Sequence, residues 1–202
     1  METTKRREQL KAALVAAAEW EINTGGLRGL KARQLAYKVG CAVGAIYNVV
    51  SDLDDLILLV NARTLDEIEH KLVAMAGPAH DPDEATAQLV RLALVYLDFA
   101  AEHTLRWRAL FDHRLPEGRD LPDWYVRNQV RLFGYIEQPV AMLQPSASPE
   151  QRRLTARSLF SAVHGMVMLG LEEKLQRIPL PALREQVTAV VTAIGRGLRE
   201  VP

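Results

Sequence analysis

Five closely spaced residues near the start of the chain are of the types that read base pairs: Val43, Gly44, Ala45, Tyr47 and Asn48. On a helix lying in the DNA major groove, a small apolar side chain contacts a thymine methyl group and an asparagine amide pairs with adenine. Glycine permits close backbone approach there, and a tyrosine hydroxyl donates to a phosphate. These types and spacings favour DNA recognition over a plain helical hairpin.

Cations flank this stretch and suit the phosphate backbone of DNA. Arg28, Lys31 and Arg33 precede it and are expected to contact phosphates. Residues 1–50 carry eight Lys or Arg against four Asp or Glu, whereas the remaining residues carry 17 against 21. The zero net charge of the 202-residue chain therefore combines a positive first part with a negative remainder. This imbalance indicates that a polyanion meets only the first part.

Two short helices that meet at a steep angle are needed to position those side chains. Residues 30–50 (LKARQLAYKVGCAVGAIYNVV) have the required pattern: Ala36 is small where the backbones approach, and Gly40 supplies the turn four positions later. The apolar residues spaced to fill the wedge between the helices are Leu35, Val39, Cys41, Ile46 and Val49. This pattern predicts a helix-turn-helix, whose second helix enters the major groove.

The segment from about Arg6 to Asn61 resembles the DNA-binding domain of the TetR family of bacterial transcriptional regulators. The matching residues are Leu10 to Ala18, Gly25-Gly26, Leu35-Ala36, Gly40, Gly44-Ala45-Ile46-Tyr47, Val50 and Leu56. The resemblance implies a homodimer that binds a two-fold symmetric operator in double-stranded DNA. It also implies a larger helical domain that dimerises and binds a small molecule, so that an inducer releases a repressor from its operator.

Three positions depart from the family pattern. Lys31 stands where a Ser or Thr usually starts the second helix, and Ala42 replaces the hydroxyl residue that caps the recognition helix. A lost cap costs about 1 kcal/mol of helix stability. Leu53 replaces a common phosphate-contacting lysine and is surrounded by acidic residues. These are Asp52, Asp54 and Asp55. The departures favour an alternative, a TetR-like sensing dimer with weak or lost specific DNA binding.

Helical spacing of apolar residues recurs along the chain, and no alternating strand pattern persists, which predicts an all-α protein. We expect a three-helix DNA-binding domain with the helix-turn-helix at 1–50, a connecting helix at 51–75 and a larger helical ligand-binding and dimerisation domain at 76–202. The breakers in residues 76–83 (AGPAHDPD) separate the last two parts. Further helices are predicted at roughly 83–103, 104–114, 122–143, 149–176 and 180–199.

The second part of the chain holds most of the aromatic residues. Residues 98–111 and 158–173 resemble a TetR subgroup named for its Trp and His-Gly positions, which here match Trp107 and His164-Gly165. A ligand pocket needs apolar walls and a few inward polar groups. The predicted walls are Trp107, Phe111, Tyr125 and Phe160, and the predicted polar groups are His103, Asn128, Gln129 and His164. We expect an apolar or aromatic inducer; the alternatives are an ordinary core and a structural, hydrogen-bonded histidine.

Two late helices have the composition of a dimer surface. The expected interface residues are Val163, Met166, Val167 and Gly170 in the first helix, and Val187, Val190, Val191 and Ile194 in the second. Pairing with the same helices of a second copy would form a four-helix bundle. The alternative is that both helices pack only within one subunit.

The sequence shows little that would support catalysis. A nucleophile with its base, a phosphate-binding loop and clustered metal ligands are all missing, so we expect no catalytic residue, metal or cofactor; an α-helical enzyme is the second alternative. Cys41 is the single cysteine and is expected to be a core residue. The absence of an evident export or membrane segment predicts a cytoplasmic protein.

Overall fold

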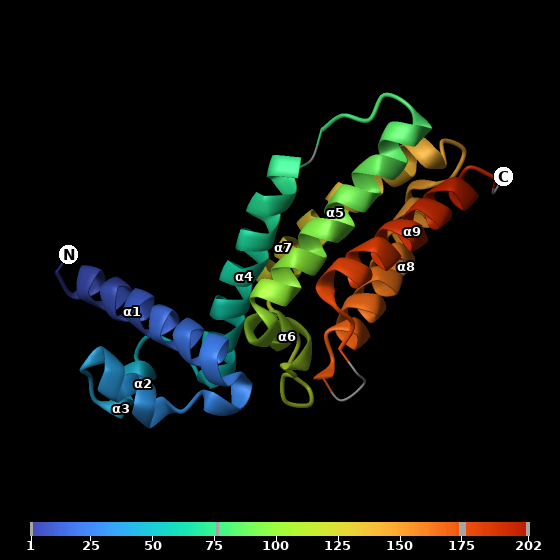
Figure 1. The fold of residues 1–202 in the computed structure, drawn as a ribbon. Helices are drawn as coiled ribbons and strands as arrows, with labels where there is room; N and C mark the ends of the chain where they lie inside the picture. Colours follow the sequence, from blue (N-terminus) through green and yellow to red (C-terminus); the bar gives the residue numbers. More distant parts are fainter. Residues whose placement is uncertain (1, 76, 174–176, 201–202) are drawn as a thin grey trace. The chain divides into compact units, whose positions relative to one another are not determined.

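The computed structural model describes residues 2–75, 77–173 and 177–200 (Figure 1). Within these residues the chain forms helices and turns without a strand, so the predicted all-α fold is confirmed. The elements are α1 (Glu2–Gly25), the 3-10 helix η1 (Leu27–Gly29), α2 (Ala32–Val39), α3 (Val43–Ile46), α4 (Leu53–Met75), α5 (Pro82–Glu102), α6 (Thr104–Asp112), α7 (Asp123–Leu143), α8 (Pro149–Gly170) and α9 (Leu180–Leu198).

Two helices are shorter than the sequence predicts. The recognition helix α3 ends at Ile46, and a turn continues it to residue 49. The helix predicted to reach residue 176 ends at Gly170, and residues 174–176 of that prediction lie outside the described residues. Helix α8 begins with a capping box: the Ser148 hydroxyl accepts from the Gln151 N–H, and the Gln151 side chain accepts from the Ser148 N–H. Pro149 follows at the first helical position, where its missing N–H costs nothing.

The chain packs as two compact units, and the unit boundaries differ from the boundaries at 50 and 75 expected from the sequence. Unit 1 comprises Met1–Asp66 and His103–Val126, and unit 2 comprises Glu67–Glu102 and Arg127–Pro202. The helix-turn-helix therefore shares its unit with α6 and the first residues of α7.

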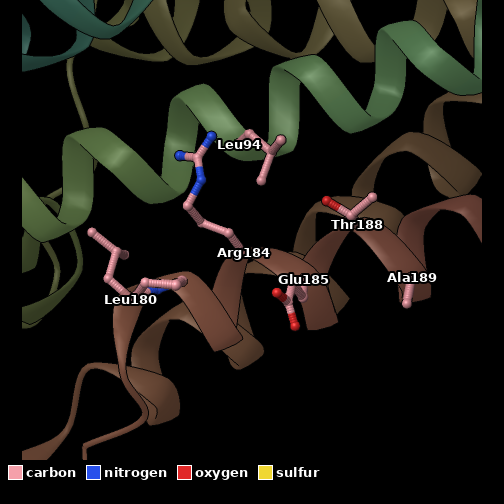
Figure 2. Close-up of a pocket in the computed structure, with 7 residues that line it drawn as sticks. Leu94, Leu180, Arg184, Glu185, Thr188 and Ala189 are labelled. Atoms are coloured by element: carbon pink, nitrogen blue, oxygen red, sulfur yellow. The ribbon is translucent and has the colours of Figure 1, made fainter.

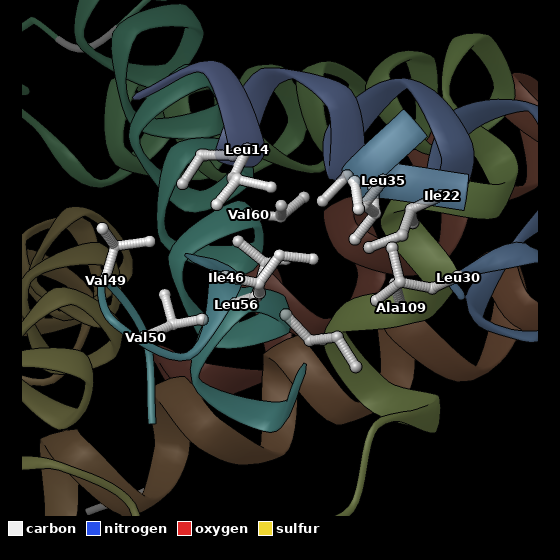
Figure 3. Packing of buried hydrophobic residues seen from close by; sticks show 14 residues of the cluster. Leu14, Ile22, Leu30, Leu35, Ile46, Val49, Val50, Leu56, Val60 and Ala109 are labelled. Carbon is white, nitrogen blue, oxygen red and sulfur yellow. The ribbon is translucent and has the colours of Figure 1, made fainter. Parts of the chain in front are cut away.

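Unit 1 has one apolar core, to which α1, α2, α3, α4 and α6 all contribute (Figure 3). The side chains of Leu14, Leu35, Ile46 and Leu56 are completely buried there. Each such burial stabilises the fold by about 1.5–3 kcal/mol. Gly40 has a φ of 71°, the left-handed conformation predicted for the turn between α2 and α3. The core thus fixes the angle between the two helices of the motif.

Unit 2 is built on the packing of α5 against α9, with α8 alongside (Figure 1). Glycines allow the helices to approach closely at two points. A Cβ added to Gly195 would lie 2.7 Å from Cγ2 of Thr86, and one added to Gly170 would lie 2.7 Å from Cδ1 of Leu183. Across the described residues, no helix is both long and apolar enough to cross a membrane.

Candidate nucleic-acid interface and ligand site

The expected base-reading residues lie on the outer face of α3 and the turn that follows it. The exposed fractions of Val43 and Tyr47 are 39% and 48%, and Gly44 and Asn48 are also exposed, whereas Ala45 is half-buried. Ile46, in the middle of this series, is completely buried and anchors the helix to the core. One side of α3 therefore holds the motif together while the other is open to a partner.

Backbone hydrogen bonds, rather than side-chain caps, hold the motif's turns. Neither Lys31 nor Ala42 makes a side-chain capping bond at the start of its helix, as their residue types lead us to expect. The N–H of Cys41 donates to the Ala36 carbonyl at 2.9 Å, and the N–H of Ala45 donates to the Ala42 carbonyl at 2.9 Å. The missing caps leave α3 dependent on the packing of Ile46.

Exposed cations surround this face. Arg28 on η1, Lys31 before α2 and Arg33 on α2 are all exposed, as phosphate contacts require. Sequence reasoning missed Arg7 and Lys11 of α1, which line a cleft of about 340 Å³ together with Tyr47 and Asn48. Their spacing of four residues, which places both on one side of a helix, is the signal that would have found them.

The aspartates at the start of α4 are paired rather than free. The Arg119 guanidinium contacts Oδ2 of Asp52 at 2.5 Å and also donates to Asp55, while Nε2 of His113 lies 2.9 Å from Oδ1 of Asp54. The Asp55 N–H, which donates to Asp52, and the Arg119 guanidinium hold the pKa of the Asp52 carboxyl below its ordinary value. Arg119 and His113 lie between α6 and α7, so the acidic cluster is compensated by a distant part of the sequence.

Four of the eight predicted ligand residues belong to unit 1. Trp107 is completely buried and Tyr125 is 2% exposed, whereas His103 is half-buried and Phe111 is 37% exposed. The Trp107 and Phe111 rings pack edge-to-face with centroids 5.6 Å apart. Burial raises the pKa of Tyr125 to about 12. Trp107 and Tyr125 therefore lie in the interior of unit 1.

The other four predicted ligand residues belong to unit 2, where two of them meet. The Phe160 and His164 rings of α8 stack with centroids 5.6 Å apart, and Asn128 and Gln129 of α7 are half-buried. Tyr96 and Phe133, which sequence reasoning did not select, complete the cluster: the Tyr96 hydroxyl lies 2.7 Å from Nδ1 of His164, and the rings of Phe133 and Phe160 pack edge-to-face. Burial lowers the pKa of His164, so its imidazole is neutral near pH 7.

Most of the expected dimer residues are covered within a single chain. Val163, Val167, Gly170, Val187 and Val191 are buried, and Met166, Val190 and Ile194 are half-buried. Their burial favours the alternative in which these positions pack within one subunit. The exposed residues of the two helices include Leu154, Ser158, Ala162 and Leu169 of α8 and Gln186, Ala189 and Ala193 of α9, together with charged residues such as Arg153, Arg157 and Glu185.

An open groove of about 680 Å³ runs between α5 and α9 (Figure 2). Its lining is largely apolar, with Leu94 on α5 and Leu180 and Ala189 on α9. Arg184 crosses it to form an ion pair with Asp98. Among the described residues, no group of three or more His, Cys, Asp or Glu side chains is arranged to hold a metal ion.

Residues 89–194 match the family model described as "Tetracyclin repressor-like, C-terminal domain". The chain belongs to the TetR family of transcriptional regulators. An uncharacterized HTH-type transcriptional regulator of Mycobacterium tuberculosis is 29% identical over 93% of this chain and 81% of its own length.

Solved structures of the TetR family share the fold. A TetR-family transcriptional regulator from Streptomyces coelicolor superposes with a TM-score of 0.66 at 19% identity, covering 96% of this chain and 84% of the other. A TetR variant from Acinetobacter baumannii in complex with minocycline gives a TM-score of 0.64 at 16% identity, covering 94% and 96% of the two chains. At such identities the likeness shows the fold alone. The Trp and His-Gly subgroup stays a prediction.

Proposed function

We propose that this TetR-family regulator is a cytoplasmic repressor that binds a two-fold symmetric operator as a homodimer and is released by a small-molecule inducer. The observation that carries the proposal is the outer face of α3, where Val43, Tyr47 and Asn48 are exposed on a helix anchored by the buried Ile46. Cations on η1, α1 and α2 surround this face and suit the phosphate backbone. The proposal includes no catalytic reaction and no cofactor.

The test of DNA binding is a gel-shift titration with the DNA next to the protein's own gene. We expect a discrete complex that survives competition by a scrambled duplex and weakens as salt rises, because phosphate contacts release counterions. A folded dimer that shows no specific complex at low salt would rule the repressor proposal out.

The inducer site is proposed at the unit 2 cluster of Tyr96, Phe133, Phe160 and His164. Three aromatic rings beside one neutral imidazole suit an apolar or aromatic ligand with a single polar group. The test is a thermal-shift screen of aromatic compounds, minocycline included. Phe160→Ala should abolish any shift that the wild type shows, and an unchanged shift would move the site elsewhere.

The homodimer is proposed to form through the exposed faces of α8 and α9, where Leu154 and Leu169 are large apolar side chains and Ala162, Ala189 and Ala193 are small. Small residues let a second pair of helices approach closely. Ala162→Glu on α8 should shift the protein from dimer to monomer in analytical ultracentrifugation. Ala12→Glu, an exposed position on α1, is the matched control and should leave the dimer intact. Dissociation in neither variant would contradict this choice of face.

A second candidate function is a sensing dimer that binds DNA only weakly. The observations that favour it are the uncapped starts of α2 and α3 and the apolar Leu53 at the start of α4. The same titration separates the candidates. Association that is equal for operator and scrambled DNA, and steeply dependent on salt, supports the sensing dimer.

A further inference from the structure

Asp54 and Asp55 lie in the first turn of α4, and Asp52 immediately precedes that helix. Asp52 caps α4 by accepting from the Asp55 N–H at 2.8 Å, and the Asp55 carboxylate accepts in turn from the Ser51 N–H at 3.1 Å. Asp55 lines the same cleft as Tyr47 and Asn48, so its carboxylate lies near the recognition turn. Uncompensated carboxylates at this point would repel the phosphates of a DNA backbone.

The segment between α6 and α7 supplies the counter-charges. One nitrogen of the Arg119 guanidinium contacts Asp52 at 2.5 Å and a second donates to Asp55, so a single side chain bridges both carboxylates. His113, whose side chain is 7% exposed, holds Asp54 at 2.9 Å. A two-point guanidinium contact fixes orientation as well as charge. The segment therefore contacts the start of α4 through two side chains, Arg119 and His113.

The same segment also borders the cleft at the recognition turn. Pro122 at the end of the segment and Trp124 in the first turn of α7 line this cleft together with Asp55, Tyr47 and Lys11. Asp55, Tyr47 and Asn48 thus line one cleft of about 340 Å³ inside unit 1. A substitution in the segment between α6 and α7 therefore alters the environment of the turn that carries Tyr47 and Asn48.

We propose that Arg119 is a positioning residue for DNA binding: it holds the turn between α3 and α4 and offsets part of the negative charge of Asp52 and Asp55 where the DNA backbone approaches. His113 makes a second contact with the start of α4, through Asp54. The inference rests on the proposed DNA binding by α3. It extends the functional part of the DNA-binding unit to a residue outside the helix-turn-helix.

The test measures binding of the full chain to a labelled 30-base-pair duplex of random sequence across a salt series. Arg119→Gln leaves both carboxylates uncompensated, so we expect affinity to fall about three- to tenfold at low salt, with the difference shrinking as salt rises and screens the charges. The slope of log K against log salt should become shallower, because salt screens the added repulsion. A merely structural loss would instead lower affinity equally at every salt concentration and lower the Tm.

Two further variants separate charge compensation from folding. Asp52→Asn in the Arg119→Gln background restores the local charge balance and keeps an effective helix cap, so it should recover most of the lost affinity. Arg114→Gln removes the same charge from an exposed position of the same segment and should have a smaller effect. Equal losses in Arg114→Gln and Arg119→Gln, or no recovery in the double variant, would overturn the proposal. If the wild-type protein binds no duplex at low salt, both this inference and the proposed function are overturned. If the wild type binds and Arg119→Gln binds equally well, this inference alone is overturned.

Discussion

The Tyr96 hydroxyl lies 2.7 Å from Nδ1 of His164, and this contact joins α5 to α8 inside unit 2. When the imidazole is neutral with its proton on Nε2, Nδ1 accepts from the Tyr96 hydroxyl. Burial lowers the pKa of His164 and favours the same neutral form. The contact therefore couples the packing of the proposed ligand cluster to the protonation of one side chain.

Acidification should destabilise unit 2 through His164. Because the folded-state pKa of His164 lies below the unfolded value of about 6.5, the unfolded chain binds more protons as the pH falls through this range. The contribution of neutral His164 to the free energy of unfolding is complete above about pH 6.5 and is lost as the pH falls through the folded-state pKa. Denaturant titrations at a series of pH values from about 7.5 down to about 5 should show that the free energy of unfolding declines as the pH falls.

His164→Phe should flatten this pH dependence because it removes the titrating group. His80→Gln changes an exposed histidine and should keep the wild-type slope. A slope that His164→Phe leaves unaltered would assign the pH dependence to other groups.

A methyl group added to Gly195 should weaken the packing of α5 against α9. The new Cβ would lie 2.7 Å from Cγ2 of Thr86, whose hydroxyl is held by the Pro82 carbonyl and by Arg199. A β-branched side chain held in this way cannot move aside easily. Gly195→Ala should therefore lower the free energy of unfolding by about 1–3 kcal/mol.

Gly197→Ala is the matched control for that substitution on the same helix. No heavy atom lies within 4 Å of a Cβ added at Gly197. Its better helix propensity should raise the free energy of unfolding by about 0.5–1 kcal/mol. Urea titrations of both variants measure the difference, and the same sign for both would refute the packing argument.

Asn48 and Lys31 should affect DNA binding in different ways. Asn48→Ala removes a base-edge contact, so it should cost about 1–3 kcal/mol on the operator and little on a scrambled duplex. Lys31→Ala removes a phosphate contact and should weaken binding to both duplexes while reducing the salt slope by about one. Fluorescence anisotropy with both duplexes provides the comparison. If Asn48→Ala weakens both duplexes equally, Asn48 does not read bases.

The helices and the recognition face were predictable because their signals are local. One helical period around the buried Ile46 is enough to place Tyr47 and Asn48 outward, and Gly40 marks the turn by its own conformational freedom. The pairings that complete the sites lack a local signal. Arg119 meets Asp52 across 67 positions, and Tyr96 meets His164 across 68. Only the tertiary packing of the helices brings these partners together.

The expected dimer residues illustrate a second limit of the sequence. An apolar stripe shows that a helix is covered, and it does not show whether the cover comes from the same chain. Val187 and Val191 are covered within unit 2, whereas Ala189 and Ala193 of the same helix stay exposed. Small residues carry little hydrophobic signal, so the outward face of α9 could not be distinguished from a solvent-exposed face.

Replacing Glu19 of α1 should strongly destabilise unit 1. Its carboxylate accepts from Nη1 of Arg106 at 2.6 Å and lies 3.1 Å from Nη1 of Arg63. The Arg106 side chain is only 8% exposed, so its charge has little access to water. Removing the partner of a buried charge is strongly destabilising, and Glu19→Ala should lower the free energy of unfolding by about 2–4 kcal/mol.

Glu102→Ala is the control for burial in this comparison. Glu102 pairs with Lys71 at 3.3 Å, but both side chains are well exposed, at 59% and 41%. Exposed ion pairs contribute about 0–1 kcal/mol because water and salt screen them. Denaturant titrations of the two variants in low and high salt should show a large, salt-insensitive loss for Glu19→Ala and a small, salt-sensitive loss for Glu102→Ala. Equal losses would mean that burial of Arg106 adds nothing to the value of its ion pair.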